Sequence, residues 1–143
     1  MKRRGSLLRL KRFRVDELKR RLGTLDEMKA DLEKRLKDLE DSVVRERQRA
    51  SDSDIGRLAF PSFLQSIEVR RKNIRTTMAE LERERVAQQD DLSVAFQDLK
   101  TFEVAEEERM RRAAEAESHA NQARMDEMAM VRHLRKHGAR QVG

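Results

Sequence analysis

Histidine is the side chain in this sequence best suited to metal chemistry, and two of the three histidines are spaced for it. His133 and His137 are four residues apart, so a helix projects both imidazoles from one face. No HExxH motif and no nearby carboxylate supplies further ligands, and His119 lies well before the pair. Serine and threonine occur without a Gly-flanked nucleophile motif or a Gly-rich phosphate loop. We therefore expect no enzyme activity, no metal or other cofactor and no small-molecule substrate.

Basic clusters near the start of the chain raise nucleic acid as a ligand. Lys2–Arg4 and Lys11–Arg14 are rich in Lys and Arg, and the sequence pI is about 10.0. Against this, the chain has no Trp or Tyr to stack on bases, and an acidic cluster at 103–108 is placed to offset the basic charge. We interpret nucleic-acid binding as the least favoured of the binding functions.

The composition excludes a thick globular core and favours long solvated helices. Of 143 residues, 42% are charged and 37% hydrophobic, with a mean hydropathy of −0.91. Charges of both signs, only five Gly and one Pro argue against a disordered chain. The sequence has no Cys and no apolar run of the roughly 18 residues that a membrane span needs. We expect a soluble intracellular protein.

The first half of the chain carries a seven-residue repeat of apolar residues. Its two registers are Leu18, Leu25, Leu32, Leu39 and Val15, Leu22, Leu36, Val43, interrupted only by Lys29. These positions alternate three and four apart, the spacing of a coiled-coil seam. The seam keeps its phase through Gly23, so we predict one helix over about residues 6–50.

Turn-forming residues then interrupt the repeat, and we predict a reversal over about 51–60. Pro61 suits the first turn of a new helix, so the second helix is predicted over about 61–137, with a frayed end at 138–143. The fold class is thus all-α: a single domain, 1–143, forming a long two-helix antiparallel coiled-coil hairpin in which the second helix overhangs the first. Residues whose numbers add up to about 110–115 should lie opposite each other.

The charge pattern agrees with the antiparallel arrangement. Residues 1–21 carry ten Lys or Arg and two acids, and the pairing places Arg12 of this segment beside Glu103 of the acidic cluster. Residues 111–143 carry seven Lys or Arg and four acids and should project past the first helix. The open end of the hairpin is therefore expected to be basic.

Two sets of apolar residues could contact other proteins. Phe60, Phe63, Leu64, Ile67 and Ile74 are bulkier than a seam needs and cannot all face one way, so part of this patch should be exposed. The methionines, including Met125, Met128 and Met130, could form an adaptable surface, but we interpret them as seam-filling residues.

Several features together resemble the FliJ family of flagellar type III export proteins. They are the basic start, the short polar turn, the segment Phe63-Leu64-Gln65-Ser66-Ile67-Glu68 at the start of the second helix, and Arg124-Met125-Asp126-Glu127 near its end. The resemblance covers essentially the whole chain. It implies a cytoplasmic export component shaped like the shaft of the rotary ATP synthase γ subunit, and peripheral to the inner membrane only through its partners.

The resemblance also implies three partners: the hexameric export ATPase, the export gate in the membrane, and export chaperones, to which no residues are assigned. The face that matches the family's gate-binding segment is Phe63, Ile67, Arg70 and Ile74. By analogy the ATPase ring would be contacted by Arg9, Arg12 and Arg14 on the first helix and Arg124, Arg132 and Arg135 on the second. One further alternative stays open: a homo-oligomeric scaffold in which the seam pairs between chains.

Overall fold

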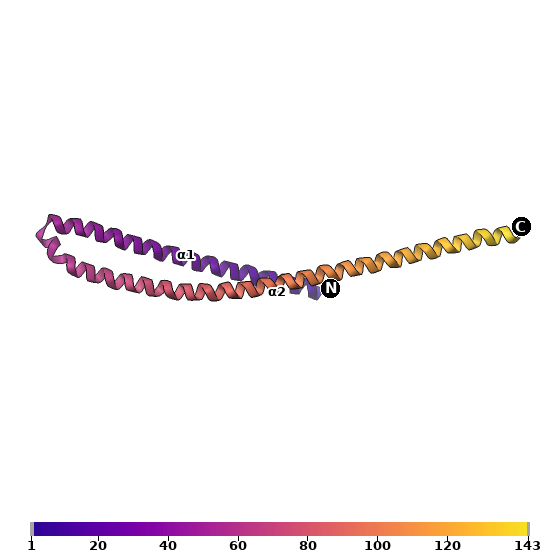
Figure 1. Ribbon diagram of the computed structural model, residues 1–143, viewed down its shortest axis with the longest axis horizontal. Coiled ribbons are helices and arrows are strands. Elements are labelled where there is room, and N and C mark those ends of the chain that lie inside the picture. Colours follow the sequence, from indigo (N-terminus) through magenta and orange to yellow (C-terminus); the bar gives the residue numbers. More distant parts are fainter. Residues whose placement is uncertain (1, 143) are drawn as a thin grey trace. The chain divides into compact units, whose positions relative to one another are not determined.

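The computed structural model describes residues 2–142 and the side chains of residues 3–138. It consists of two helices, α1 (Lys2–Asp52) and α2 (Asp54–Val142), with no strand among the described residues (Figure 1). The chain divides into two compact units, Met1–Leu99 and Lys100–Gly143. The first unit is the predicted all-α hairpin, in which α1 lies beside the first part of α2. The second unit is the rest of α2.

Ion pairs between α1 and α2 confirm the antiparallel register. Lys11 pairs with Asp98 at 2.5 Å, Asp26 with Arg85 at 2.8 Å, and Glu40 with Arg71 at 2.7 Å. The residue numbers of these pairs add up to 109, 111 and 111, of which the first lies just below the predicted range and the other two lie within it. The expected overhang and the pairing of Arg12 with Glu103 involve both units and stay predictions.

The apolar seam of the hairpin contains the residues that the seven-residue repeat predicts. Seven of the ten buried apolar residues are on α1, and six of these belong to the predicted seam: Val15, Leu18, Leu22, Leu25, Leu32 and Val43. Leu36, Leu39 and the interrupting Lys29 are half-buried. From α2, Leu81 packs with Leu25 and Leu32, and Ile74 and Met78 pack against this cluster. Helix α1 continues through Gly23, as predicted.

The turn is much shorter than predicted, because Ser53 alone connects the helices. Its N–H donates to the carbonyl of Arg49 at 3.2 Å, and its carbonyl accepts from the N–H of Arg57 at 3.1 Å. Its hydroxyl oxygen accepts from the N–H of Gly56 at 3.0 Å, the bond of a helix N-cap. Asp54 in the first turn of α2 also suits the positive end of the helix dipole.

The predicted turn over 51–60 and the predicted helix start at Pro61 are therefore wrong. Pro61 lies inside α2, where it cannot donate to the carbonyl of Arg57, and the cap at Ser53 starts the helix seven residues earlier. Gly56 makes the short turn possible: a Cβ atom there would lie 2.7 Å from the carbonyl oxygen of Arg49. At the other end, α2 continues past the predicted end at 137 to Val142.

Candidate protein-binding surfaces

The four residues predicted to bind the export gate lie partly inside the hairpin. Ile67 is 1% exposed, and Phe63 and Ile74 are half-buried. Ile74 packs against the cluster of Leu25, Leu32 and Leu81, and only Arg70 of the four is exposed. In this conformation Ile67 is a packing residue of the hairpin and offers no surface to a partner.

The accessible part of this face is a groove between the two helices. It has a volume of about 380 Å³ and is lined by Arg35, Asp38 and Leu39 of α1 and by Arg70, Asn73 and Ile74 of α2. Neither Arg35 nor Arg70 makes an ion pair with another described residue. The groove thus offers the side chain of Ile74 next to two arginines and one carboxylate, that of Asp38, which suits a partner with an apolar side chain flanked by charged groups.

Arg71, next to Arg70 of this groove, joins the two helices by hydrogen bonds. Its Nη2 donates to Glu40 of α1 at 2.8 Å, and its Nη1 donates to Glu68 on α2. These hydrogen bonds, first that of Glu40 and then that of Glu68, raise the pKa of Arg71 above its ordinary value. Arg85 is held similarly by Asp26, whose hydrogen bond raises the pKa of that guanidinium. The two arginines thus join α1 to α2 by ion pairs that agree with the register of the apolar seam.

The arginines predicted to contact the ATPase ring form one set in each unit. Arg9, Arg12 and Arg14 are exposed on α1, and the Nε of Arg9 donates to the carbonyl of Gly5 at 3.4 Å. Arg124, Arg132 and Arg135 line one hollow of about 560 Å³ on α2, together with Glu127, Met128 and Val131. The structure therefore brings the three arginines of the second set together around an apolar centre.

Sequence reasoning missed an apolar surface next to Arg14. Leu10 and Phe13 are 62% and 57% exposed, and with Leu7 they line a groove of about 430 Å³ that Ala95 and Asp98 complete from α2. These residues stand outside the seven-residue repeat, which starts at Val15. That position outside the repeat was the signal that could have marked them as surface residues.

The second unit is half-buried at some positions before Met110 and exposed at the described positions from Met110 onward. Every described side chain from Met110 to Gly138 is exposed, including a row of small residues, Ala113, Ala116, Ala120 and Ala123. Met110, Met125, Met128 and Met130 are 58–67% exposed. The interpretation of these methionines as seam-filling residues is therefore wrong for the single chain. They belong to the surface instead, because no described segment covers this part of α2.

The histidine pair has the predicted proximity. The rings of His133 and His137 are 4.1 Å apart between centroids and nearly perpendicular, and both residues are exposed. Within residues 2–142, no group of three or more His, Cys, Asp or Glu side chains is arranged to hold a metal ion. Neither helix, over its described length, is long and apolar enough to cross a membrane.

Comparison with known proteins identifies a family over nearly the whole chain. The family model described as "Flagellar FliJ protein" matches residues 1–138. Neither the curated proteins nor the solved structures gave a significant match to this chain. The match agrees with the resemblance carried by the Phe63–Glu68 and Arg124–Glu127 segments.

Proposed function

The chain belongs to the FliJ family and is a flagellar export-related coiled-coil protein, and from this premise we propose that it couples the export ATPase ring to the export gate. In this proposal it acts mechanically and allosterically, at the cytoplasmic face of the membrane, and also assists the handling of export chaperones. It binds proteins and performs no catalysis of its own.

The observation that carries the ATPase contact is the exposure of α2 from Met110 to Gly138. A helix of this length that packs on no other described segment is stabilised only by its own backbone and side-chain pairs, and its apolar side chains are available to a partner. Arg124, Arg132 and Arg135 surround Met128 and Val131 on one face, so this face combines an apolar centre with a basic rim. Such a rim steers association with an acidic surface and makes it sensitive to salt.

The gate contact is proposed for the groove that contains Arg70 and Ile74. Arg70 and Ile74 are the members of the predicted gate face that line this groove. Phe63 is half-buried, and the exposed part of its side chain adds to the contact surface. Ile67 supports this contact indirectly by packing the hairpin. In this proposal Arg70 and Ile74 contact the gate directly and Phe63 contacts it in part. Ile67 positions the other three.

Co-purification with the export ATPase tests the ring contact. The charge reversal Arg124→Glu, Arg132→Glu and Arg135→Glu should weaken the complex and the stimulation of ATP hydrolysis about tenfold or more. A matched control reverses three exposed arginines of α1, Arg20, Arg45 and Arg47, and changes the net charge equally. Equal losses in both variants would show a general charge effect and contradict the assignment.

A homo-oligomeric scaffold is the second candidate, favoured by the exposed alanine seam of the second unit. Pairing between chains would cover Ala113, Ala116, Ala120 and Ala123. Sedimentation distinguishes the two functions, because a free single chain has a mass of 16.9 kDa. A stable dimer that dissociates when Ala116 and Ala120 are changed to Glu would favour the scaffold.

A further inference from the structure

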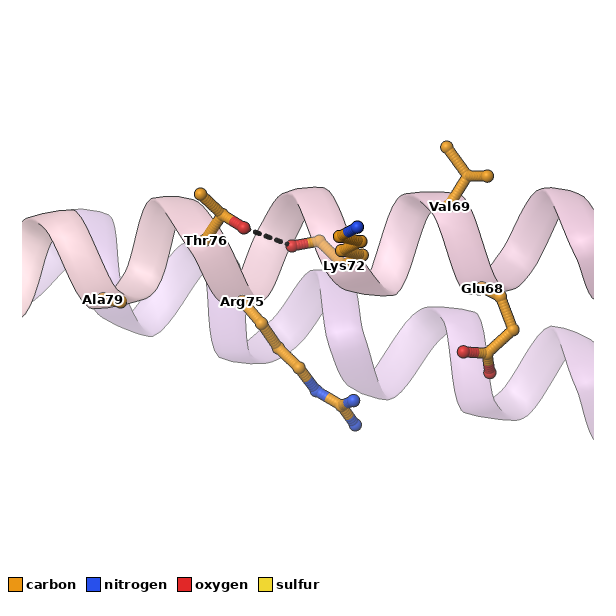
Figure 2. A pocket seen from close by; sticks show the side chains of 6 residues that line it. All are labelled: Glu68, Val69, Lys72, Arg75, Thr76 and Ala79. Carbon is orange, nitrogen blue, oxygen red and sulfur yellow. Dashed lines mark hydrogen bonds between the residues drawn. The ribbon is translucent and has the colours of Figure 1, made fainter.

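One face of α2 in the first unit has not yet been assigned a function; in Figure 2 its residues Glu68 and Arg75 extend across the second ribbon. A hollow of about 580 Å³ lies along it, lined by Glu68, Val69, Lys72, Arg75, Thr76 and Ala79, all from α2. Figure 2 shows Val69 and Thr76 projecting to the side of α2 away from the second ribbon. Val69 is 60% exposed and the other five are exposed too. This outer face is distinct from the one that carries Ile67 and Ile74.

The positive charges of Lys72 and Arg75 on the outer face have no ion-pair partner among the described residues. Their neighbour Arg71, in contrast, is bound to Glu40 and Glu68. The only carboxylate at the hollow, that of Glu68, is thus engaged by Arg71. Lys72 and Arg75 are left to attract a negatively charged partner.

Thr76 on the outer face requires no polar partner. The hydroxyl of Thr76 donates to the carbonyl of Lys72 at 2.9 Å, a bond drawn in Figure 2, so it is satisfied inside the helix. Val69 and Ala79 add apolar surface on either side of it. The face therefore combines apolar surface from Val69, Thr76 and Ala79 with one cation, Lys72, between Val69 and Thr76 and a second, Arg75, to one side.

The dimensions and chemistry select the kind of partner. Residues 68–79 span about 17 Å of helix, roughly three turns, and the lining residues recur at spacings of three and four. Such a row of side chains forms the ridges and grooves into which another helix packs. No aromatic side chain lines the hollow to stack on a base, which disfavours single-stranded nucleic acid.

We propose that the outer face of α2, formed by Val69, Lys72, Arg75, Thr76 and Ala79, is a docking surface for an acidic amphipathic helix of a partner protein. The partner helix places a small apolar stripe on Val69 and Ala79 and carboxylates beside Lys72 and Arg75. This contact uses none of the residues assigned to the gate or to the ATPase ring, so it stands or falls independently of them.

Three synthetic peptides of equal length test the proposal with the full chain. The first is a helix with a stripe of Ala and Leu flanked by Glu, the second has the same residues in scrambled order, and the third has Lys in place of Glu. Fluorescence anisotropy should show binding of the first peptide at least tenfold tighter than of either other peptide. Rising salt should weaken this binding, because surface charges are screened.

Two matched variants locate the site. Lys72→Glu with Arg75→Glu should reduce binding of the first peptide at least tenfold, and Val69→Ser should reduce it without a change of charge. Arg35→Glu with Arg70→Glu reverses two arginines at the other groove and should leave binding nearly unchanged. Circular dichroism should show the same helicity for all variants, since every changed residue is exposed.

Equal binding of the scrambled peptide would overturn the proposal, because it would show attraction by charge alone. An equal loss in the Arg35 and Arg70 variant would assign the peptide to the groove between the helices instead. Preferential binding of a DNA oligonucleotide or of vesicles of anionic lipid, lost in the Lys72 and Arg75 variant, would assign the outer face to a different class of ligand.

Discussion

Ile67→Ala is expected to destabilise the hairpin, although the sequence places Ile67 on a partner-binding face. The residue is 1% exposed and is, with Leu18, one of the two large side chains that are fully buried. The substitution removes three carbon atoms, each worth about 0.8 kcal/mol of burial, and leaves a gap that the thin seam can only partly close. The higher helix propensity of alanine offsets a few tenths of a kcal/mol of this loss in the free energy of unfolding. The free energy of unfolding should fall by about 2–3 kcal/mol.

Thermal and urea unfolding followed by circular dichroism at 222 nm measure this loss. For a chain of this length, about 2–3 kcal/mol corresponds to a decrease in Tm of roughly 5–10 °C. Val69→Ala is the matched control: it lies two residues further along α2 and is 60% exposed. Its free energy of unfolding should change by less than about 0.5 kcal/mol.

An unchanged midpoint for Ile67→Ala, combined with lost binding of the export gate, would refute the reasoning. It would mean that Ile67 faces a partner and that the helices pack through another face. Equal destabilisation by both variants would also contradict it, since burial would then not distinguish the two positions.

The remaining predictions concern backbone positions. Gly56→Ala should lower the free energy of unfolding by about 1–3 kcal/mol, because its Cβ would meet the carbonyl of Arg49, whereas Gly23→Ala should raise it by up to about 1 kcal/mol, because nothing lies within 4 Å there. Urea unfolding of both variants tests this contrast, and equal signs would contradict it. Ser53→Ala should cost about 1 kcal/mol through loss of the N-cap and increase hydrogen exchange in the first turn of α2, while unchanged exchange at Gly56 would argue against the cap.

The hairpin could be predicted from the sequence because the apolar residues that hold its helices together recur at a regular spacing. Val15, Leu18 and Leu22 repeat at the spacing of a supercoiled seam, and a repeat of that kind leaves few alternatives to helix pairing. The turn could not be placed, because five of the six residues from Ser51 to Gly56 favour turns and only the hydrogen bonds of Ser53 decide which of them caps the helix. Pro61 was misleading, since its preference for a first helical turn is a tendency that the cap outweighs.

The binding surfaces were harder to predict than the fold. Apolar residues at helical spacing occur both in cores and on docking surfaces. The sequence pattern of Phe63, Ile67 and Ile74 therefore does not distinguish the two roles. Only the packing of α1 on α2 shows that Ile67 is inside. Arg124, Arg132 and Arg135 were named by analogy alone, although their position around one hollow depends on a single helix and is compatible with 3.6 residues per turn.

Crosslinking between positions 26 and 85 tests most directly that one chain folds back on itself. The protein has no cysteine, so Asp26→Cys with Arg85→Cys introduces the only two thiols, at an ion pair that joins α1 to α2 at 2.8 Å. A short bis-maleimide added to dilute protein should give an internally linked species with the mass of a single chain, and the variant Asp26→Cys with Arg57→Cys should not. Links formed only between chains, or none at all, would contradict the hairpin on which the proposed surfaces depend.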